Sequence, residues 1–318
     1  MKRRHTAFST WIVASVVSFL PASAIAIPQE QQDYTIHSDV RLVLLDVGVK
    51  DRKGSPVSGL SKDNFTVLED GRPQPIEVFV ADDVPVTVGI VMDESFSMAP
   101  KRLSVITAAK TFVESSNPAD EVFVLHFNDK VTRGLPEPQL FSGDPERLSK
   151  ALQRGVPEGK TALNDAVIEG LQQLELGKFD KKALVLISDG GDNASHHTRG
   201  EMVDAVVKSS ATIYTIGLYE PDNPDRNPGI LRELARISGG EAFFPATPPD
   251  TIPVCRRIAR DIRARYTIGY VPRSEGNAVR HIHVRVDAPD RGKLTAITRN
   301  SYRYDEIHTQ KKSSAALD

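Results

Sequence analysis

The stretch "VTVGIVMDESFSMAP", residues 86–100, joins an apolar run to a polar one. Residues 86–92 are mostly β-forming and apolar, which is typical of a central parallel strand buried on both faces. Three short oxygen-bearing side chains then follow at alternate positions, namely Asp93, Ser95 and Ser97. Taken alone, this Asp-x-Ser-x-Ser stretch is equally compatible with a polar turn that caps a following helix. Whether these side chains form only a turn or part of a binding site depends on the residues elsewhere in the sequence.

Strand-like and helix-like patterns alternate on the carboxyl-terminal side of this stretch. We expect the alternation to fill residues 85–265, with a helix at 101–116 that places Leu103, Ile106 and Phe112 on its buried side. We expect the other strands at 121–127, 182–188, 212–218 and 240–246, and the other helices at 146–154, 161–176, 200–210, 229–238 and 252–266. This order predicts an α/β fold, a doubly wound and mostly parallel sheet with helices on both faces.

Two further β-rich segments flank the alternating region. Residues 34–84 contain period-2 patterns and a turn at Asp70 and Gly71, and residues 266–304 return to strand patterns. Two separate β units of this size would each bury little core. We therefore expect the 85–265 domain to be inserted into one small β-sandwich, in which 266–304 pairs with 34–84. The polar segment 305–318 is expected to be a disordered tail.

The first 26 residues have the layout of a cleavable signal peptide. Three basic residues precede an apolar run at 11–20, and small residues such as Ala24 and Ala26 follow it. The run is shorter than the ~20 residues of a spanning helix, which disfavours the alternative of an uncleaved membrane anchor. The sequence thus predicts an exported protein, periplasmic or secreted, without stable membrane insertion after signal cleavage.

The net charge disfavours one class of partner, and the cysteine content excludes an internal disulfide. The chain has 40 Lys and Arg against 42 Asp and Glu, so removal of three basic residues with the signal leaves 37 against 42, a net charge of −5. A nucleic-acid partner needs a basic face, so we expect none. The single cysteine, Cys255, excludes an internal disulfide and is expected to be a buried apolar residue rather than a catalytic thiol.

Two more stretches are predicted to reach the edge of the sheet where Asp93 lies. Thr161 precedes a helix, and Asp189 follows an apolar strand. Ligands of doubly wound sheets bind beside the carboxyl ends of the strands. The predicted metal ligands are Asp93, Ser95, Ser97, Thr161 and Asp189. Two carboxylates and three hydroxyls suit Mg²⁺, Mn²⁺ or Ca²⁺ and disfavour zinc, and hydroxyls leave part of the ion's charge for another carboxylate.

These stretches resemble the metal-ion-dependent adhesion site (MIDAS) of von Willebrand factor type A (VWFA) domains. The matching residues are 93–97 followed by Met98, Thr161 after Gly159, and Asp189 before Gly190. The resemblance implies that the hydroxyls of Ser95, Ser97 and Thr161 coordinate the ion directly, and that Asp93 and Asp189 act largely through water. It implies an adhesion-type, non-enzymatic module that binds an Asp or Glu of a protein partner. Residues 34–304 also resemble the VWFA-related group frequent in acidobacterial genomes, which implies a secreted binding protein.

Two positions depart from the family pattern. Phe96 and Lys160 both stand where glycine is common. Phe96 is either an exposed contact residue or part of the core. Lys160 either lowers metal affinity or attracts an acidic ligand.

Two other functions are compatible with the same residues. The metal could serve only to stabilise the loops of a structural or assembly protein. A metal-dependent phosphatase or hydrolase is the third reading, but such enzymes usually carry a second acid two positions after the nucleophile, where this chain has Ser95. The sequence at 159–161 is not a P-loop, because the required first glycine is replaced by Arg154.

The remaining histidines and basic residues favour ordinary roles. The adjacent pair His196 and His197 and the strand pair His281 and His283 lack a visible third ligand, so a second metal site is disfavoured. The basic stretch after Cys255 is expected to be a solvated helix face held by pairs such as Arg257 with Asp261.

Overall fold

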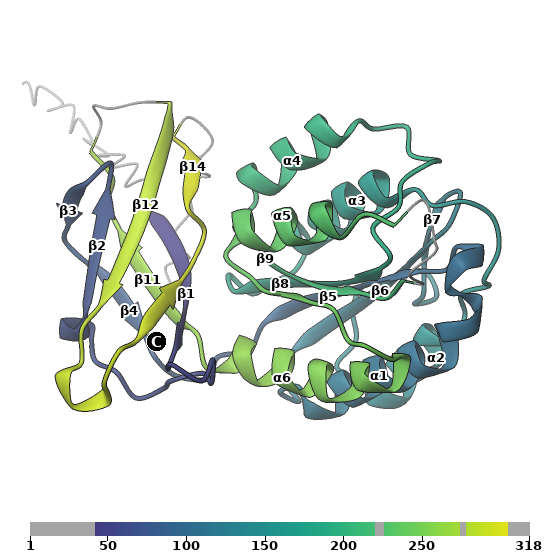
Figure 1. The fold of residues 1–318 in the computed structure, drawn as a ribbon, viewed down its shortest axis with the longest axis horizontal. Helices are drawn as coiled ribbons and strands as arrows, with labels where there is room; N and C mark the ends of the chain where they lie inside the picture. The colour runs from purple at the N-terminus through teal and green to yellow at the C-terminus, as the bar shows by residue number, and fades with distance from the viewer. Residues whose placement is uncertain (1–41, 220–225, 274–277, 305–318) are drawn as a thin grey trace, which may run out of the picture. The chain divides into compact units, whose positions relative to one another are not determined.

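The computed structural model describes residues 42–219, 226–273 and 278–304 (Figure 1). The predicted signal peptide at 1–26 and the predicted tail at 305–318 lie outside these residues. The first part of the predicted 34–84 β segment, up to residue 41, also lies outside them.

A six-stranded sheet forms the centre of the α/β region, in the order β10-β9-β8-β5-β6-β7. The first five of these strands pair in parallel, and β7 pairs antiparallel to β6 at one edge. β5 lies in the middle of the order and is buried at every position, as its continuous apolar run predicts. The strands are β5 (Thr87–Asp93), β6 (Glu121–Phe127), β7 (Val131–Arg133), β8 (Lys182–Ser188), β9 (Thr212–Gly217) and β10 (Ala242–Phe243).

Helices cover both faces of this sheet (Figure 1). One face is buried under α1 (Arg102–Ser115), α2 (Pro145–Leu152) and α6 (Thr251–Arg263). The other is buried under α3 (Leu163–Glu175), α4 (Arg199–Lys208) and α5 (Pro228–Ser238). Short 3₁₀ helices lie at η1 (Lys62–Asn64), η2 (Phe96–Lys101), η3 (Pro248–Asp250) and η4 (Pro289–Arg291). Among the described helices, none has both the length and the apolar character needed to cross a membrane.

Two four-stranded antiparallel sheets share a separate apolar core, which makes the flanking segments a small β-sandwich. Their orders are β13-β1-β11-β4 and β14-β12-β2-β3. Strands from before and after the α/β region pair directly, β1 with β11 and β2 with β12. The bounds are β1 (Val43–Lys50), β2 (Phe65–Glu69), β3 (Arg72–Gln74), β4 (Val78–Val80), β11 (Tyr266–Tyr270), β12 (Val279–Val286), β13 (Thr295–Ile297) and β14 (Ser301–Arg303). The fold class predicted from the sequence is confirmed.

Two details of the helices differ from the sequence prediction. Leu103 is 79% exposed rather than buried, because it lies one turn before the exposed Thr107 on the solvent face of α1. The expected pair of Arg257 with Asp261 does not form. Arg257 instead donates to Glu241 over 2.8 Å, and Asp261 accepts a hydrogen bond from the Tyr214 hydroxyl over 2.6 Å.

Candidate functional site

The candidate site lies where β5 and the neighbouring β8 end. β5 ends at Asp93, and Asp189 directly follows the last residue of β8. The chain leaves β5 to one side for β6 and later returns on its other side as β8, so the strand order reverses at this point. A reversal leaves a crevice between the departing loops, which is where open α/β sheets bind ligands.

A chain of hydrogen bonds connects three of the predicted ligands. The Ser97 hydroxyl donates to Asp189 Oδ2 over 2.7 Å, and the Ser95 and Ser97 oxygens lie 3.2 Å apart. Because Ser97 has only one hydroxyl proton and gives it to Asp189, Ser95 is the donor to Ser97. The structure thus brings these oxygens into one compact group.

Asp93 lies next to this group and is 3% exposed. Its carboxylate accepts the Ser95 backbone N–H over 2.8 Å and the Ser188 hydroxyl over 2.6 Å. Burial raises the pKa of Asp93 to about 6, with a further contribution from the charge of Asp189, although these hydrogen bonds lower it. Two carboxylates are therefore held close together in a buried place.

Thr161 lies just before α3 and is hydrogen-bonded to the loop that follows β8. Its backbone N–H donates to Asn193 Oδ1 over 2.9 Å, and its carbonyl accepts the Asn193 N–H over 2.9 Å. Asp192 Oδ1 also accepts the Leu163 N–H over 2.9 Å, which fixes the start of α3. The Thr161 hydroxyl has no hydrogen bond to the other four predicted ligands within the described part of the chain. Asn193 thus positions Thr161, and Asp192 holds the first turn of α3 next to it.

The residues between the predicted ligands point elsewhere. Glu94 is buried and accepts from Arg102 Nε over 2.8 Å, and its other oxygen lies 3.2 Å from His126 Nδ1. Phe96 is 75% exposed, so it is not part of the core, and a contact role stays a prediction. Lys160 is also exposed. Alternate side chains thus go to the oxygen group, while those between them go to an interior ion-pair network or to solvent.

Glycines at two loop positions let the backbone close around the site. Gly159 has φ +74° and its carbonyl accepts the Phe96 N–H over 3.3 Å, while a Cβ there would overlap the Asp129 carboxylate. Gly190 has φ +81°, and a Cβ there would overlap the carbonyl oxygen of Asn227. Both positions require the left-handed conformation that glycine adopts at low cost.

The donor set fits a hard divalent cation. Among the described residues there is no group of three or more His, Cys, Asp or Glu side chains placed to hold a metal ion, so any cation here depends on the serine and threonine hydroxyls. Lys101 is buried nearby and donates to the Ser97 carbonyl over 3.2 Å, so its charge offsets only part of that of Asp93 and Asp189. Oxygen donors with a residual negative charge match Mg²⁺, Mn²⁺ or Ca²⁺ better than zinc.

His196 and His197 both contact the carboxylate of Asp165. Both imidazoles lie against one carboxylate, with His197 Nδ1 2.7 Å and His196 Nδ1 3.1 Å from Asp165. Burial alone would raise the pKa of Asp165, but the hydrogen bonds from the backbone and side chains of the two histidines lower it. Asp165 thereby anchors the loop before α4.

Comparison with known proteins matches part of the chain to a family model. Residues 88–191 match the family model of the von Willebrand factor type A domain. The chain contains a von Willebrand factor type A domain. A solved von Willebrand factor type A structure from Catenulispora acidiphila is similar over 83% of this chain and 72% of its own, with a TM-score of 0.51 and 14% identity. At that identity the likeness shows the VWFA fold alone.

Two of the other similar proteins match about half of this chain. An uncharacterized protein of Synechocystis sp. is 24% identical over 185 residues, which are 56% of this chain and 43% of the relative, so the chain spans under half of that relative's length. An aerotolerance-related membrane protein from Bacteroides fragilis is 18% identical over 56% of this chain and 98% of its own, with a TM-score of 0.45. The narrower resemblance to the acidobacterial VWFA-related group stays a prediction.

Proposed function

We propose that the protein is an exported protein-binding module whose VWFA domain recognises a partner through a divalent cation. Asp93, Ser95, Ser97, Thr161 and Asp189 would hold Mg²⁺, with Mn²⁺ or Ca²⁺ as alternatives. The cation would supply a Lewis-acidic position for an Asp or Glu carboxylate of the partner. VWFA domains are often adhesion or interaction modules and are generally not enzymes, which supports this proposal.

The observation that carries the proposal is the hydrogen-bond chain from Ser95 through Ser97 to Asp189. It gathers hydroxyl and carboxylate oxygens at one strand edge, although the two segments are 92 residues apart. A polar turn that only capped a helix would use Asp93, which accepts the Ser95 N–H, but it would not need Asp189. Together with the Asn193 contacts that position Thr161, the arrangement supports a binding site rather than a polar turn.

The surface next to the site suits a protein partner. Phe96, Leu103 and Val156 are 75%, 79% and 58% exposed, and they belong to the few large apolar side chains that the described chain exposes. Two contacts connect their segments. The Phe96 N–H donates to the Gly159 carbonyl, and Arg102 NH2 donates to the Gly155 carbonyl. Exposed apolar side chains next to a cation that binds a carboxylate would suit a partner that presents an Asp or Glu among apolar residues.

The hydrolase alternative finds less support in the geometry. His126 of β6 contacts Glu94, which stands between Asp93 and Ser95. His126 is buried and has both ring nitrogens against protein atoms, Glu94 Oε1 and the Ala151 carbonyl. It therefore has no free nitrogen to serve as a general base toward a substrate. A stabilising metal in a structural protein fits the same ligands, and the experiment below separates it from the binding role.

The test begins with thermal unfolding of residues 27–318 with and without millimolar MgCl₂, MnCl₂ or CaCl₂. A cation at one hundred times its Kd adds about 2.7 kcal/mol of stability by linkage. For a domain of this size, that corresponds to a Tm increase of roughly 5–10 °C. We expect this increase in the wild type and in Thr107→Ala, which removes an exposed hydroxyl on α1. Thr161→Ala and Asp189→Ala should lose it.

Partner capture then tests the binding role. We expect a partner isolated with the wild type to be lost in EDTA while the far-UV circular dichroism spectrum persists. Phe96→Ala should weaken capture without changing the metal-dependent Tm increase, because the side chain is exposed and contributes no ligand. An unchanged Tm in the wild type at every metal concentration would refute the cation site. A Tm increase with EDTA-resistant capture would instead assign the metal a stabilising role only.

A further inference from the structure

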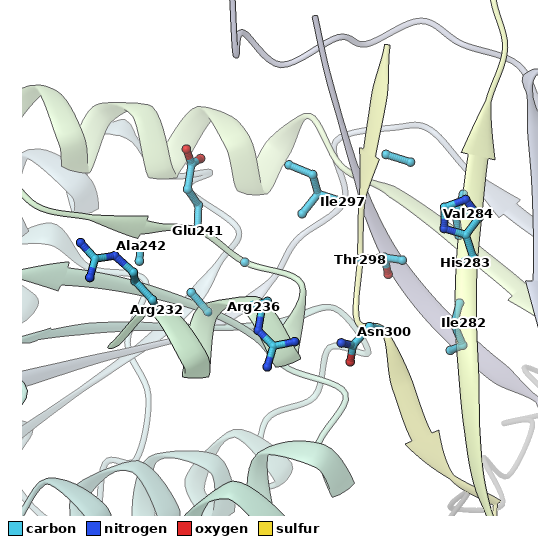
Figure 2. Close-up of a pocket in the computed structure, with 13 residues that line it drawn as sticks. Arg232, Arg236, Glu241, Ala242, Ile282, His283, Val284, Ile297, Thr298 and Asn300 are labelled. Carbon is cyan, nitrogen blue, oxygen red and sulfur yellow. The ribbon is translucent and has the colours of Figure 1, made fainter. Parts of the chain in front are cut away.

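A second cleft of about 590 Å³ lies apart from the oxygen group, between the VWFA domain and the β-sandwich. Figure 2 shows Arg232 and Arg236 of α5 on one side of it, and His283, Thr298 and Asn300 of the sandwich on the other. Its volume lies within the ~300–1,000 Å³ typical of ligand sites.

The cleft has an excess of positive charge. Arg232 and Arg236 form no ion pair with any described residue, and both are exposed. The one acidic residue among those that line the cleft is Glu241, whose carboxylate is bound by Lys50 and, over 2.8 Å, by Arg257. A protein with more acidic than basic residues therefore concentrates uncompensated cations at this place.

The two arginines are arranged for a ligand with more than one anionic group. They lie four residues apart on α5, so they share one face of the helix. Arg232 Cζ lies 4.4 Å from the ring centroid of Phe244, which restricts the guanidinium group by a cation–π contact. Planar guanidinium groups bind carboxylates through two parallel hydrogen bonds.

The opposite wall offers polar partners. Thr298 Oγ1 is buried and finds no hydrogen-bond partner among the described residues, and Asn300 and His283 are exposed at the same cleft. A buried hydroxyl without a hydrogen-bond partner destabilises the fold unless a ligand or a water molecule forms that hydrogen bond. The wall therefore supplies the hydrogen-bonding groups that an anionic, polar ligand would use.

The strands beside the cleft favour an extended ligand. β10 is the edge strand of the six-stranded sheet and β13 is the edge strand of one sandwich sheet, and both contribute residues to the cleft. Edge strands present backbone groups that can pair with an added extended chain. We propose that this cleft binds a short, extended acidic peptide segment of a partner protein, with the carboxylates of that segment on Arg232 and Arg236.

The test measures binding of a fluorescein-labelled hexaglutamate peptide by anisotropy, in EDTA and at two salt concentrations, with hexaglutamine as the uncharged control. Arg232→Gln/Arg236→Gln removes both cations from the cleft. The matched control is Arg256→Gln/Arg260→Gln, which removes two exposed arginines with the same spacing from α6, outside the cleft. We expect at least a tenfold weaker affinity in the cleft variant and less than a twofold change in the control.

Three outcomes would overturn the proposal. Equal losses in the two double variants would show attraction to net charge rather than to the cleft. Direct binding of inorganic phosphate, measured by calorimetry, together with no measurable peptide binding would make the cleft a small-anion site. Tighter, Arg232-dependent binding of an oligothymidylate would assign it to nucleic acid. Because the titration is done in EDTA, and Thr161→Ala should leave it unchanged, its result is independent of the cation site.

Discussion

Arg265 offers the sharpest quantitative test of the architecture. Its side chain is 1% exposed and donates through NH2 to three carbonyls from different elements, those of Asp46, Gly239 and Ile297, over 2.8, 2.8 and 3.1 Å. Its Nε lies 2.6 Å from Asp46 Oδ2, at an angle unsuited to a hydrogen bond, and NH1 lies 3.4 Å from Asp261 Oδ2. One guanidinium thus joins the sandwich to the VWFA domain.

Arg265→Met would remove this junction and leave two buried or half-buried carboxylates without their main cation. Burial alone would lower the pKa of Arg265, but Tyr214, Asp46 and Asp261 raise it, so the native group is charged. Removing one partner of a buried ion pair costs ~3–5 kcal/mol. Lys50 remains 3.5 Å from Asp261, so we expect the lower end of this range. At 2–4 °C per kcal/mol, the Tm should fall by roughly 6–12 °C.

Urea unfolding monitored by far-UV circular dichroism would measure the loss in unfolding free energy, and calorimetry would measure the fall in Tm. Arg260→Met is the control, because that side chain is exposed on α6, five residues before Arg265, and its loss should change stability by less than ~0.5 kcal/mol. Arg265→Lys should fall between them, since a lysine keeps the charge but not the planar fork. A loss below ~1 kcal/mol for Arg265→Met would refute the assignment of Arg265 as the junction.

Three further outcomes follow from the buried groups. Burial raises the pKa of the Cys255 thiol to about 12, so we expect no reaction with Ellman's reagent at pH 8 until urea unfolds the chain; prompt labelling of the native protein would contradict its burial. Glu69→Ala removes the carboxylate that pairs with Arg280 and accepts hydrogen bonds from the hydroxyls of Tyr270 and Tyr302, and it should cost ~3 kcal/mol in urea titrations. Gly190→Ala should cost at least ~1 kcal/mol by calorimetry, because of its positive φ and the Asn227 carbonyl; a neutral result would refute the strain.

The sequence predicted the fold because its local patterns agree with one another. The all-apolar run of β5 requires burial on both faces, and the alternation after it permits few topologies. Three of the predicted ligands needed no structure to be placed together, since they follow one strand within five residues. Periodicity failed for Leu103, where one apolar side chain near a helix start does not define a face.

Contacts between segments that are far apart in the sequence could not be predicted from the sequence. The sequence suggested an Arg257–Asp261 pair from helical spacing, whereas tertiary partners on β9 and before β10 take both side chains. Local spacing is a weak constraint on an ion pair, because an exposed pair gains only ~0.3–0.5 kcal/mol and a better buried partner easily displaces it.

The sequence by itself determined the class of fold, the oxygen-rich strand ends and the chemistry those oxygens suit, because each depends on residues that are neighbours in the chain or on strand order. Only the tertiary structure decided that Phe96 faces solvent, that Asn193 positions Thr161, and that α5 and β12 form a basic cleft. These features depend on contacts between segments that are far apart in the sequence. Local sequence patterns do not specify such contacts.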